Sequence, residues 1–146
     1  MRVLIDTNVL VRSVQRKHPS SRAARHALVA LYRGDCSLFI TPQNVAEFWN
    51  VCTRPKEVNG IGLSIEAANR YVDQMQKFLV VLADTTKAFQ AWRKLVVEHA
   101  VKGAKVHDAR LVASMRSYGI GRILTFNVGD FSRYGDIEAI HPDTVA

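Results

Sequence analysis

Five short apolar segments, separated by longer stretches with helical periodicity, constrain the fold more than any other feature of this sequence. They are residues 2–6 (RVLID), 37–40 (SLFI), 78–83 (FLVVLA), 122–126 (RILTF) and 137–140 (IEAI). Each is apolar nearly throughout, which is typical of strands buried on both faces. Strands that alternate with helices predict a parallel sheet covered on both sides. We therefore predict an α/β fold, a three-layer α/β/α sandwich around a central, mainly parallel five-stranded sheet, with residues 1–146 as one domain.

The stretches between these strands carry recognisable helix signals. We predict helices from residue 20 or 21 to about 31, from 42 to about 53, from 64 towards 77, after a cap at 84–86, and from about 107 to 118. Thr41 followed by Pro42 suits the N-cap and the first helical position, where the missing proline N–H does no harm. Residues 54–63 (RPKEVNGIGL) are predicted to be a loop, and residues 7–19 are not assigned to a helix or a strand.

Composition and cysteine content predict a globular cytoplasmic chain with no membrane partner. Hydrophobic residues make up 48% and charged residues 23%, and no stretch approaches the roughly 18 uninterrupted apolar residues of a membrane span. The first strand begins within the first three residues, which leaves no room for a signal peptide. Cys36 and Cys52 are isolated and lack metal-ligand spacing, so we expect reduced, packed thiols.

The chain is basic, and its positive charge is uneven. Its 20 Lys and Arg against 13 Asp and Glu give +7, which is compatible with a polyanionic partner. No acid occurs between Asp6 and Asp35, whereas that stretch contains Arg12, Arg16, Lys17, Arg22, Arg25 and Arg33. The charge count by itself favours a solvated helix face slightly over a phosphate-binding surface, and both interpretations stay open.

The first strand runs directly into a carboxylate at Asp6, which is followed by Thr7 and Asn8. Ligands of open parallel sheets gather at the carboxyl ends of the strands, so Asp6 is a candidate site residue. A carboxylate that caps the following turn or helix explains the same position equally well. Thr7 and Asn8 could position a water or a phosphate oxygen, or form only a local turn.

Asp108 is directed to the same edge of the sheet by a separate argument. In the helix predicted there, the apolar stripe leads back from Leu111, Val112 and Met115, in steps of three, four and seven residues, to Asp108. The carboxylate thus shares the buried face in the first turn, where the helix dipole also favours an anion for purely structural reasons. If the fold is right, Asp108 lies near Asp6.

Two further acids carry weaker signals. Glu47 falls with Gln43 on the polar side of its predicted helix, so periodicity alone makes it a surface acid. Asp130 follows the fourth strand, near whose end Thr125 and Asn127 also stand. The Gly-Asp pair at 129–130 can equally form only a turn.

Together these segments resemble the PIN-domain ribonucleases, in particular the VapC-type toxins of bacterial toxin–antitoxin pairs, over essentially the whole chain. The matching pieces, in order, are IDTNVLV, TPQNVAEFWNVCTRP, VHDARLVASM and ILTFNVGDF. Any one of them is a weak signal, but four in this order and at this spacing are specific. The resemblance implies a single PIN domain over residues 1–146 and a metal-dependent endoribonuclease that hydrolyses RNA phosphodiester bonds.

The resemblance also implies which residues form the site. Asp6, Glu47 and Asp108 match the three acids that bind divalent metal in PIN domains. Asp130, assisted by Asn127, is the candidate for the fourth acidic position, because the family often has an acid where this chain has Asn127. In this arrangement Asp6 and Asp108 hold the principal ion, Glu47 orients or deprotonates the attacking water, and Asp130 supports a second ion.

Carboxylates that converge need a cation between them. Two unit charges about 5 Å apart repel by roughly 3 kcal/mol at an effective dielectric of 20, so three or four acids together would destabilise the fold on their own. Hard oxygen ligands suit Mg²⁺ or Mn²⁺. The resemblance implies cleavage products with a 5′-phosphate and a 3′-hydroxyl.

Other residues near these acids have weaker predicted roles. The auxiliary residues near the site are Thr7, Asn8, Thr125 and Asn127, and the candidates for RNA backbone contacts are Arg12, Arg16, Lys17 and Arg110. Such basic contacts raise the affinity for all RNA alike. We expect His107 to be a packed or solvent-facing neighbour, and Trp49 and Trp92 to belong to the core rather than to stack on bases.

The toxin assignment implies two protein partners, a cognate antitoxin and a second copy of the chain in a homodimer. Three other functions compete with it. A phosphoacceptor signalling domain would use Asp84, but no acidic pair follows the first strand. A phosphatase of the haloacid dehalogenase type needs a second acid where Asn8 stands. A non-catalytic RNA- or partner-binding PIN-like domain stays open because of Asn127.

Overall fold

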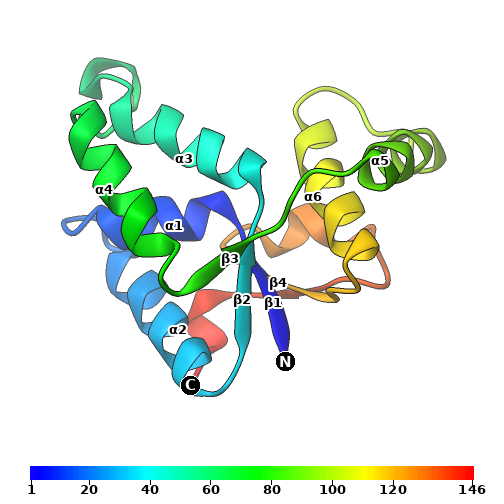
Figure 1. The fold of residues 1–146 in the computed structure, drawn as a ribbon, viewed down its shortest axis with the longest axis horizontal. Coiled ribbons are helices and arrows are strands. Elements are labelled where there is room, and N and C mark those ends of the chain that lie inside the picture. Colours follow the sequence, from blue (N-terminus) through cyan, green and yellow to red (C-terminus); the bar gives the residue numbers. More distant parts are fainter.

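Five strands form one parallel sheet in the computed structural model, which describes residues 1–146 (Figure 1). In chain order they are β1 (Arg2–Ile5), β2 (Ser37–Ile40), β3 (Leu79–Val81), β4 (Arg122–Leu124) and β5 (Glu138–Ile140). Their order across the sheet is β3-β2-β1-β4-β5, and every neighbouring pair is parallel. The predicted five-stranded α/β sheet is confirmed, and each strand lies within its predicted range.

Six helices and three short 3₁₀ turns connect the strands. The helices are α1 (Thr7–Val14), α2 (Ser21–Arg33), α3 (Pro42–Thr53), α4 (Ile65–Met75), α5 (Thr86–Glu98) and α6 (Lys105–Ser117), and the 3₁₀ turns are η1 (Lys56–Val58), η2 (Val128–Phe131) and η3 (Pro142–Thr144). In Figure 1, α1 to α4 lie on one side of the sheet, and α5 and α6 lie on the other. None of these helices has the length and apolar character needed to cross a membrane.

Alternate residues of the strands face two separate cores, one on each face of the sheet. The sheet is therefore the middle of three layers, with helices on both sides. In β1, Val3 and Ile5 pack with apolar residues of α1 to α4, whereas Leu4 packs with Leu95 of α5 and Leu111 of α6. The three β1 residues are fully buried. Burial of each such side chain stabilises the fold by about 1.5 to 3 kcal/mol. The predicted three-layer sandwich therefore follows directly from the all-apolar strands.

The helix α1 is an element that the sequence pattern did not predict. Thr7, Asn8 and the valines of this segment have low helix propensity, so the local sequence does not favour a helix. Burial of Val9, Leu10 and Val11 overrides that preference.

Neither cysteine forms a disulfide, in agreement with the sequence analysis.

The strand order places a topological switch point between β1 and β4. From β1 the chain moves outward through β2 to β3, and then returns to place β4 on the other side of β1. Open parallel sheets bind ligands at such a switch point, outside the carboxyl ends of the strands. Ile5 is the register partner of Leu124, so the next residues along the chain, Asp6 and Thr125, lie side by side at this switch point.

Candidate functional site

Asp6 lies at the junction of β1 and α1. It is the N-cap of α1, and its Oδ1 accepts a hydrogen bond from the backbone N–H of Thr7 at 2.8 Å. Asp6 is only 8% exposed, so most of the carboxylate is shielded from water. The two interpretations that the sequence left open, a helix cap and a residue at the ligand-binding edge of the sheet, therefore apply to Asp6 together.

A hydroxyl and an amide fix the second oxygen of this carboxylate. Thr125 Oγ1 donates to Asp6 Oδ2 at 2.8 Å, and Asn8 Nδ2 donates to the same oxygen at 3.3 Å. Asn8 Oδ1 in turn accepts from the backbone N–H of Phe126, and Thr125 Oγ1 accepts from that of Asn127. These bonds tie the start of α1 to the segment after β4 and hold the carboxylate in one orientation.

Replacing Thr125 by Val is expected to destabilise the protein by about 2 kcal/mol, because the buried Asp6 carboxylate loses one of its donors and the N–H of Asn127 loses its acceptor. The pKa of Asp6 should also rise, since the hydrogen bond from Thr125 lowers it. Urea unfolding at pH 7 measures the first effect, and NMR titration of the Asp6 carboxyl carbon measures the second. Thr125→Ser keeps the hydroxyl and is the matched control, so an equal pKa rise in both variants would contradict this role.

The buried amide of Asn44 joins α3 to α1 next to the site. Its Nδ2 donates to Thr7 Oγ1 at 3.0 Å, and its Oδ1 accepts from the N–H and the hydroxyl of Thr41. Thr41 and Asn44 form a capping box, which confirms the predicted start of α3. The sequence analysis missed Asn44 as a residue of the site. The Thr-Pro-x-Asn spacing of the capping box is the signal that could have identified it.

Gln43 connects α3 to the start of α6. Its Nε2 donates to Glu47 Oε1 at 2.9 Å and to the carbonyl of His107 at 3.0 Å. Periodicity placed Gln43 on the polar side of the helix with Glu47, but Gln43 is only 8% exposed because it packs against α6. Glu47 is exposed, as predicted. Gln43 Oε1 is buried and has no donor, so it offers a free acceptor beside Glu47.

The pKa of Asp6 shows that neighbouring acids are close enough to affect it. Burial raises this pKa from 3.8 to about 6, although hydrogen bonds from Thr125 and Thr7 lower it. The charges of Asp108 and Glu47 raise it further. A carboxylate in these surroundings is less stable in its charged form than in water, so a nearby cation would be favourable.

Asp108 lies in the first turn of α6 and is half buried, as the apolar stripe of this helix predicted. Burial raises its pKa, and the negative charges of Asp130 and Glu47 raise it further. Lys105 and His107 lower it. All four predicted acids therefore interact electrostatically through Asp108 and Asp6.

Asp130 differs from the other acids because the chain itself supplies a cation to it. Lys105, the first residue of α6, forms an ion pair with Asp130 in η2, and this contact raises the pKa of Lys105. Asn127 contributes its backbone N–H to Thr125, while the residue as a whole is exposed. A second metal ion at Asp130 would require the ion pair with Lys105 to open.

The donors of this site fit a hard divalent cation bound by few protein ligands. The acids are near one another, but no three His, Cys, Asp or Glu side chains form a group that could hold a metal ion. Mg²⁺ is commonly bound by one or two carboxylates, with waters in its remaining positions. Asp6 and Asp108 provide two such oxygen donors, and a nearby dication would favour their charged forms, which burial and the neighbouring acids disfavour. The expected enclosure of an ion by three or four acids is not seen.

The predicted RNA-binding side chains lie in two places. Three of them lie at or just beyond the far end of α1, namely Arg12, Arg16 and Lys17. Since α1 has eight residues and so spans about 12 Å, they are a helix length away from Asp6. Arg110 lies in α6, two residues after Asp108, and is the candidate that adjoins the acids.

The sequence analysis predicted that His107 is a packed or solvent-facing neighbour of the site, and that Trp49 and Trp92 belong to the core. His107 is exposed. Trp49 and Trp92 are half buried and pack against the two different cores. The indole of Trp92 is fixed against the start of α6, because its Nε1 donates to the carbonyl of Val106 at 2.9 Å.

Solved structures with the same fold include bacterial VapBC proteins. The chain is similar to one in the structure of VapBC2 from Rickettsia felis bound to a DNA fragment from their promoter, with 16% identity, a TM-score of 0.74, and 97% of this chain and 98% of that chain covered. It is also similar to a chain in the structure of DNA-bound VapBC from Salmonella typhimurium, with 18% identity, a TM-score of 0.72, and 97% of this chain and 98% of that chain covered. A third similar structure is that of VapC20 from Mycobacterium tuberculosis, described as a sarcin-ricin loop cleaving toxin. It has 21% identity and a TM-score of 0.67, and 91% of this chain and 95% of that chain are covered. At these identities the similarity establishes the fold.

The family comparison goes further than the fold. A family model described as the PIN domain matches residues 3–137, a span that includes every acid of the candidate site. Comparison with curated protein sequences gives no match. Because the family model covers nearly the whole chain, the protein is a member of the PIN domain family.

Proposed function

We propose that this protein is a metal-dependent ribonuclease that hydrolyses RNA phosphodiester bonds and serves as the toxin of a type II toxin–antitoxin pair. The observation that carries the proposal is the buried carboxylate of Asp6 at the switch point of a PIN-domain sheet, with its pKa raised by burial and by Asp108. Two neighbouring acids whose charged forms are disfavoured by burial, at the carboxyl ends of the strands, suit a dication site better than a structural role. The similarity to VapC20, described as a sarcin-ricin loop cleaving toxin, supports RNA as the substrate.

In the proposed mechanism, each residue of the site has a separate task. Asp6 and Asp108 would hold the ion, which would supply Lewis-acid chemistry there: a lower pKa for water and neutralisation of charge on the phosphoryl oxygens. Glu47 orients the attacking water or accepts its proton. Gln43 holds Glu47 by a hydrogen bond. Thr125 keeps the Asp6 carboxylate in its orientation.

Adding Mn²⁺ or Mg²⁺ is expected to raise the melting temperature relative to EDTA. A ligand at about 100 times its Kd stabilises the folded state by about 2.7 kcal/mol, which for a chain of this length corresponds to roughly 5 to 11 °C. Asp6→Asn should abolish this gain. Asp136→Asn should retain it in full, because that exposed carboxylate pairs with Arg116 away from the proposed ligands. Absence of any shift in the wild-type protein would contradict the metal site.

The chemistry of the cleaved ends tests the reaction itself. Hydrolysis by an activated water should leave a 5′-phosphate and a 3′-hydroxyl, and the products should appear only when metal is present. A 2′,3′-cyclic phosphate would instead indicate attack by the ribose hydroxyl without this site. Enzymatic extension of the fragments from their 3′ ends distinguishes the two results.

A non-catalytic RNA- or partner-binding PIN-like domain is the second candidate. The observation that favours it is the ion pair between Lys105 and Asp130, which neutralises one of the acids. Asn127, where the family often has an acid, is a second departure. In this case the protein would retain RNA on a filter without producing fragments in Mg²⁺ or in Mn²⁺.

We also propose an antitoxin partner and a homodimer. Two of the similar structures are VapBC structures, and another is described as a toxin–antitoxin complex from Klebsiella pneumoniae. An apolar groove of about 620 Å³ lies between α1, α2 and α4, and the arginines along it are Arg16, Arg25 and Arg33. An amphipathic helix with acidic flanks is complementary to such a groove. Co-expression with a neighbouring short reading frame, followed by light scattering on the free and complexed protein, tests both partners.

A further inference from the structure

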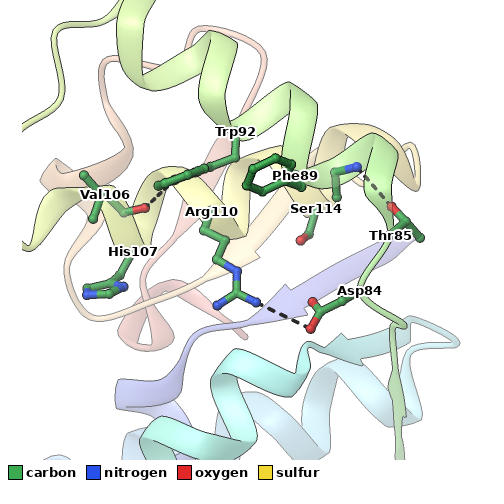
Figure 2. A pocket seen from close by; sticks show the side chains of 9 residues that line it. Asp84, Thr85, Phe89, Trp92, Val106, His107, Arg110 and Ser114 are labelled. Atoms are coloured by element: carbon green, nitrogen blue, oxygen red, sulfur yellow. Dashed lines mark hydrogen bonds and ion pairs between the residues drawn. The ribbon is translucent and has the colours of Figure 1, made fainter.

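A pocket of about 410 Å³ lies between α5 and α6 (Figure 2), and one of the residues that line it, His107, directly precedes Asp108. Its volume falls within the range of small-molecule sites. The residues that matter here are Phe89 and Trp92 from α5, His107, Arg110 and Ser114 from α6, and Asp84 from the segment before α5. Neither the proposed cleavage mechanism nor the antitoxin groove uses this pocket.

Phe89 gives the pocket an accessible aromatic ring. The residue is 55% exposed, and its ring centroid lies 6.1 Å from that of Trp92, with the two planes 35° apart. Trp92 is held by its bond to the Val106 carbonyl, so it lines the pocket as well as packing against the core, which goes beyond its predicted role. An accessible ring backed by a fixed indole is suited to stacking of an unpaired RNA base.

An acceptor and a donor lie together in the same pocket. Arg110 Nη2 is 3.4 Å from Asp84 Oδ2, and the two side chains are 47% and 55% exposed. Figure 2 shows this pair below the rings of Phe89 and Trp92. A long, exposed ion pair contributes little stability. A ligand with matching polar groups can therefore engage both side chains at small cost.

Guanine is the base that matches this pair. Its Watson–Crick edge has two adjacent N–H donors, on N1 and N2, and the two oxygens of a carboxylate can accept both. Its O6 and N7 accept from a guanidinium group. Adenine, cytosine and uracil lack two adjacent donors on that edge. Asp84 and Arg110 thus provide a chemical basis for choosing guanine.

The pocket is connected to the acids through the first turn of α6. The carbonyl of His107 accepts from Gln43, which also holds Glu47. Asp108 directly follows His107, and Arg110 lies three residues after His107 on the same side of the helix. Asp108 and two residues that line the pocket therefore share the first two turns of α6, which puts the pocket within reach of a nucleotide adjoining one bound at Asp108.

We propose that this pocket binds an unstacked guanine of the RNA, next to the scissile phosphate. Phe89 stacks on the base, Asp84 accepts from N1 and N2, and Arg110 donates to O6 or N7. The assignment rests on the proposed ribonuclease function. It adds the sequence preference that contacts to phosphates do not supply.

Binding of short RNA to the Asp6→Asn protein tests the pocket apart from cleavage. The probes are three labelled pentanucleotides, AAGAA, AAAAA and AAIAA, of which the last contains inosine and lacks the 2-amino group. Fluorescence anisotropy gives the Kd of each. We expect AAGAA to bind most tightly and AAIAA to be intermediate. Phe89→Leu should weaken binding of AAGAA by about 5- to 150-fold through loss of one stacked base, whereas Phe89→Tyr should not.

Two further variants sharpen the assignment. Asp84→Asn should reduce the preference for guanine over inosine, because the amide offers only one acceptor oxygen. Val97→Ala is the control on the same helix, since Val97 is 79% exposed and does not line the pocket. It should change neither affinity nor base preference.

Each outcome separates the pocket from the ribonuclease proposal. Equal affinity for AAGAA and AAAAA, or unchanged affinity in Phe89→Leu, overturns the pocket even if the wild-type protein cuts RNA. A change in molar mass of Phe89→Leu by light scattering, without a change in RNA affinity, would show that a second copy covers the pocket, and this also overturns it. Guanine preference that depends on Phe89 in a chain that cuts no RNA supports the pocket and contradicts only the ribonuclease proposal.

Discussion

Replacing Asp6 by Asn is expected to lower the rate of RNA cleavage by more than about a hundredfold. Residues that only support a metal ligand already change affinity or activity by about 10- to 100-fold, and Asp6 is itself a proposed ligand. Asn keeps the size of the side chain and an oxygen for the N–H of Thr7, but it removes the negative charge that attracts a dication. A gel assay with labelled RNA at fixed Mn²⁺ concentration measures the rate.

Asp136→Asn is the matched control for this experiment. It removes the same charge from an exposed side chain that pairs with Arg116, so cleavage should continue at the wild-type rate. Thermal melting followed by circular dichroism shows whether both variants are folded. A folded Asp6→Asn protein that cleaves RNA within about tenfold of the wild-type rate would contradict a ligand role, because even supporting residues have effects of that size.

The strands could be predicted because burial on both faces leaves a signature that does not depend on knowing the neighbours. Val3, Leu4 and Ile5 are consecutive and all fully buried, and only a central strand of a covered sheet readily buries a run of this kind. Parallel strands place Asp6 and Thr125 at the same edge of the sheet, and the two residues meet there because β1 and β4 are neighbours. Their 2.8 Å hydrogen bond is thus a consequence of two strand ends in register.

The buried amides beside the acids could not be predicted in this way. Helical periodicity detects apolar residues, whereas Gln43 and Asn44 are buried because side-chain and backbone partners satisfy them. Those partners come from residues distant in sequence, including the His107 carbonyl and the Thr7 hydroxyl. A polar residue with partners of this kind cannot be distinguished from a surface residue before the helices are placed.

The ion pair at Asp130 escaped prediction for a different reason. The helix α6 begins at Lys105, two residues earlier than predicted, and its N-cap is Ala104, which has no capping side chain. Gly103 precedes it with a positive φ of 60°, so no conventional capping residue marks this boundary. Because the helix starts two residues earlier than predicted, Lys105 lies in its first turn, beside Asp130. The number of ions that the site can accept therefore depends on where one helix starts.

Without metal, the wild-type protein is expected to lose stability relative to Asp6→Asn as the pH rises from about 4 to 6. Burial raises the pKa of Asp6 from 3.8 to about 6, so the folded state keeps a proton that the unfolded chain releases. This proton stabilises the folded state at low pH, and the contribution is lost as the pH rises through the folded-state pKa. Above that pH the charged form lowers the free energy of unfolding by about 3 kcal/mol, at 1.36 kcal/mol per pKa unit.

The comparison with Asn isolates this effect, because Asn at position 6 does not titrate. Asp136, whose pKa is lowered by Arg116, changes stability with pH in the opposite direction, but it is present in both proteins and cancels in the difference. Urea unfolding in EDTA at pH 4, 5, 6 and 7 gives that difference directly. Saturating Mg²⁺ at pH 7 should remove most of the loss, since a dication favours the charged carboxylate. A difference that stays constant from pH 4 to 7 would mean that Asp6 titrates like a solvated acid, and a cation beside it would then offset no cost of burying its charge.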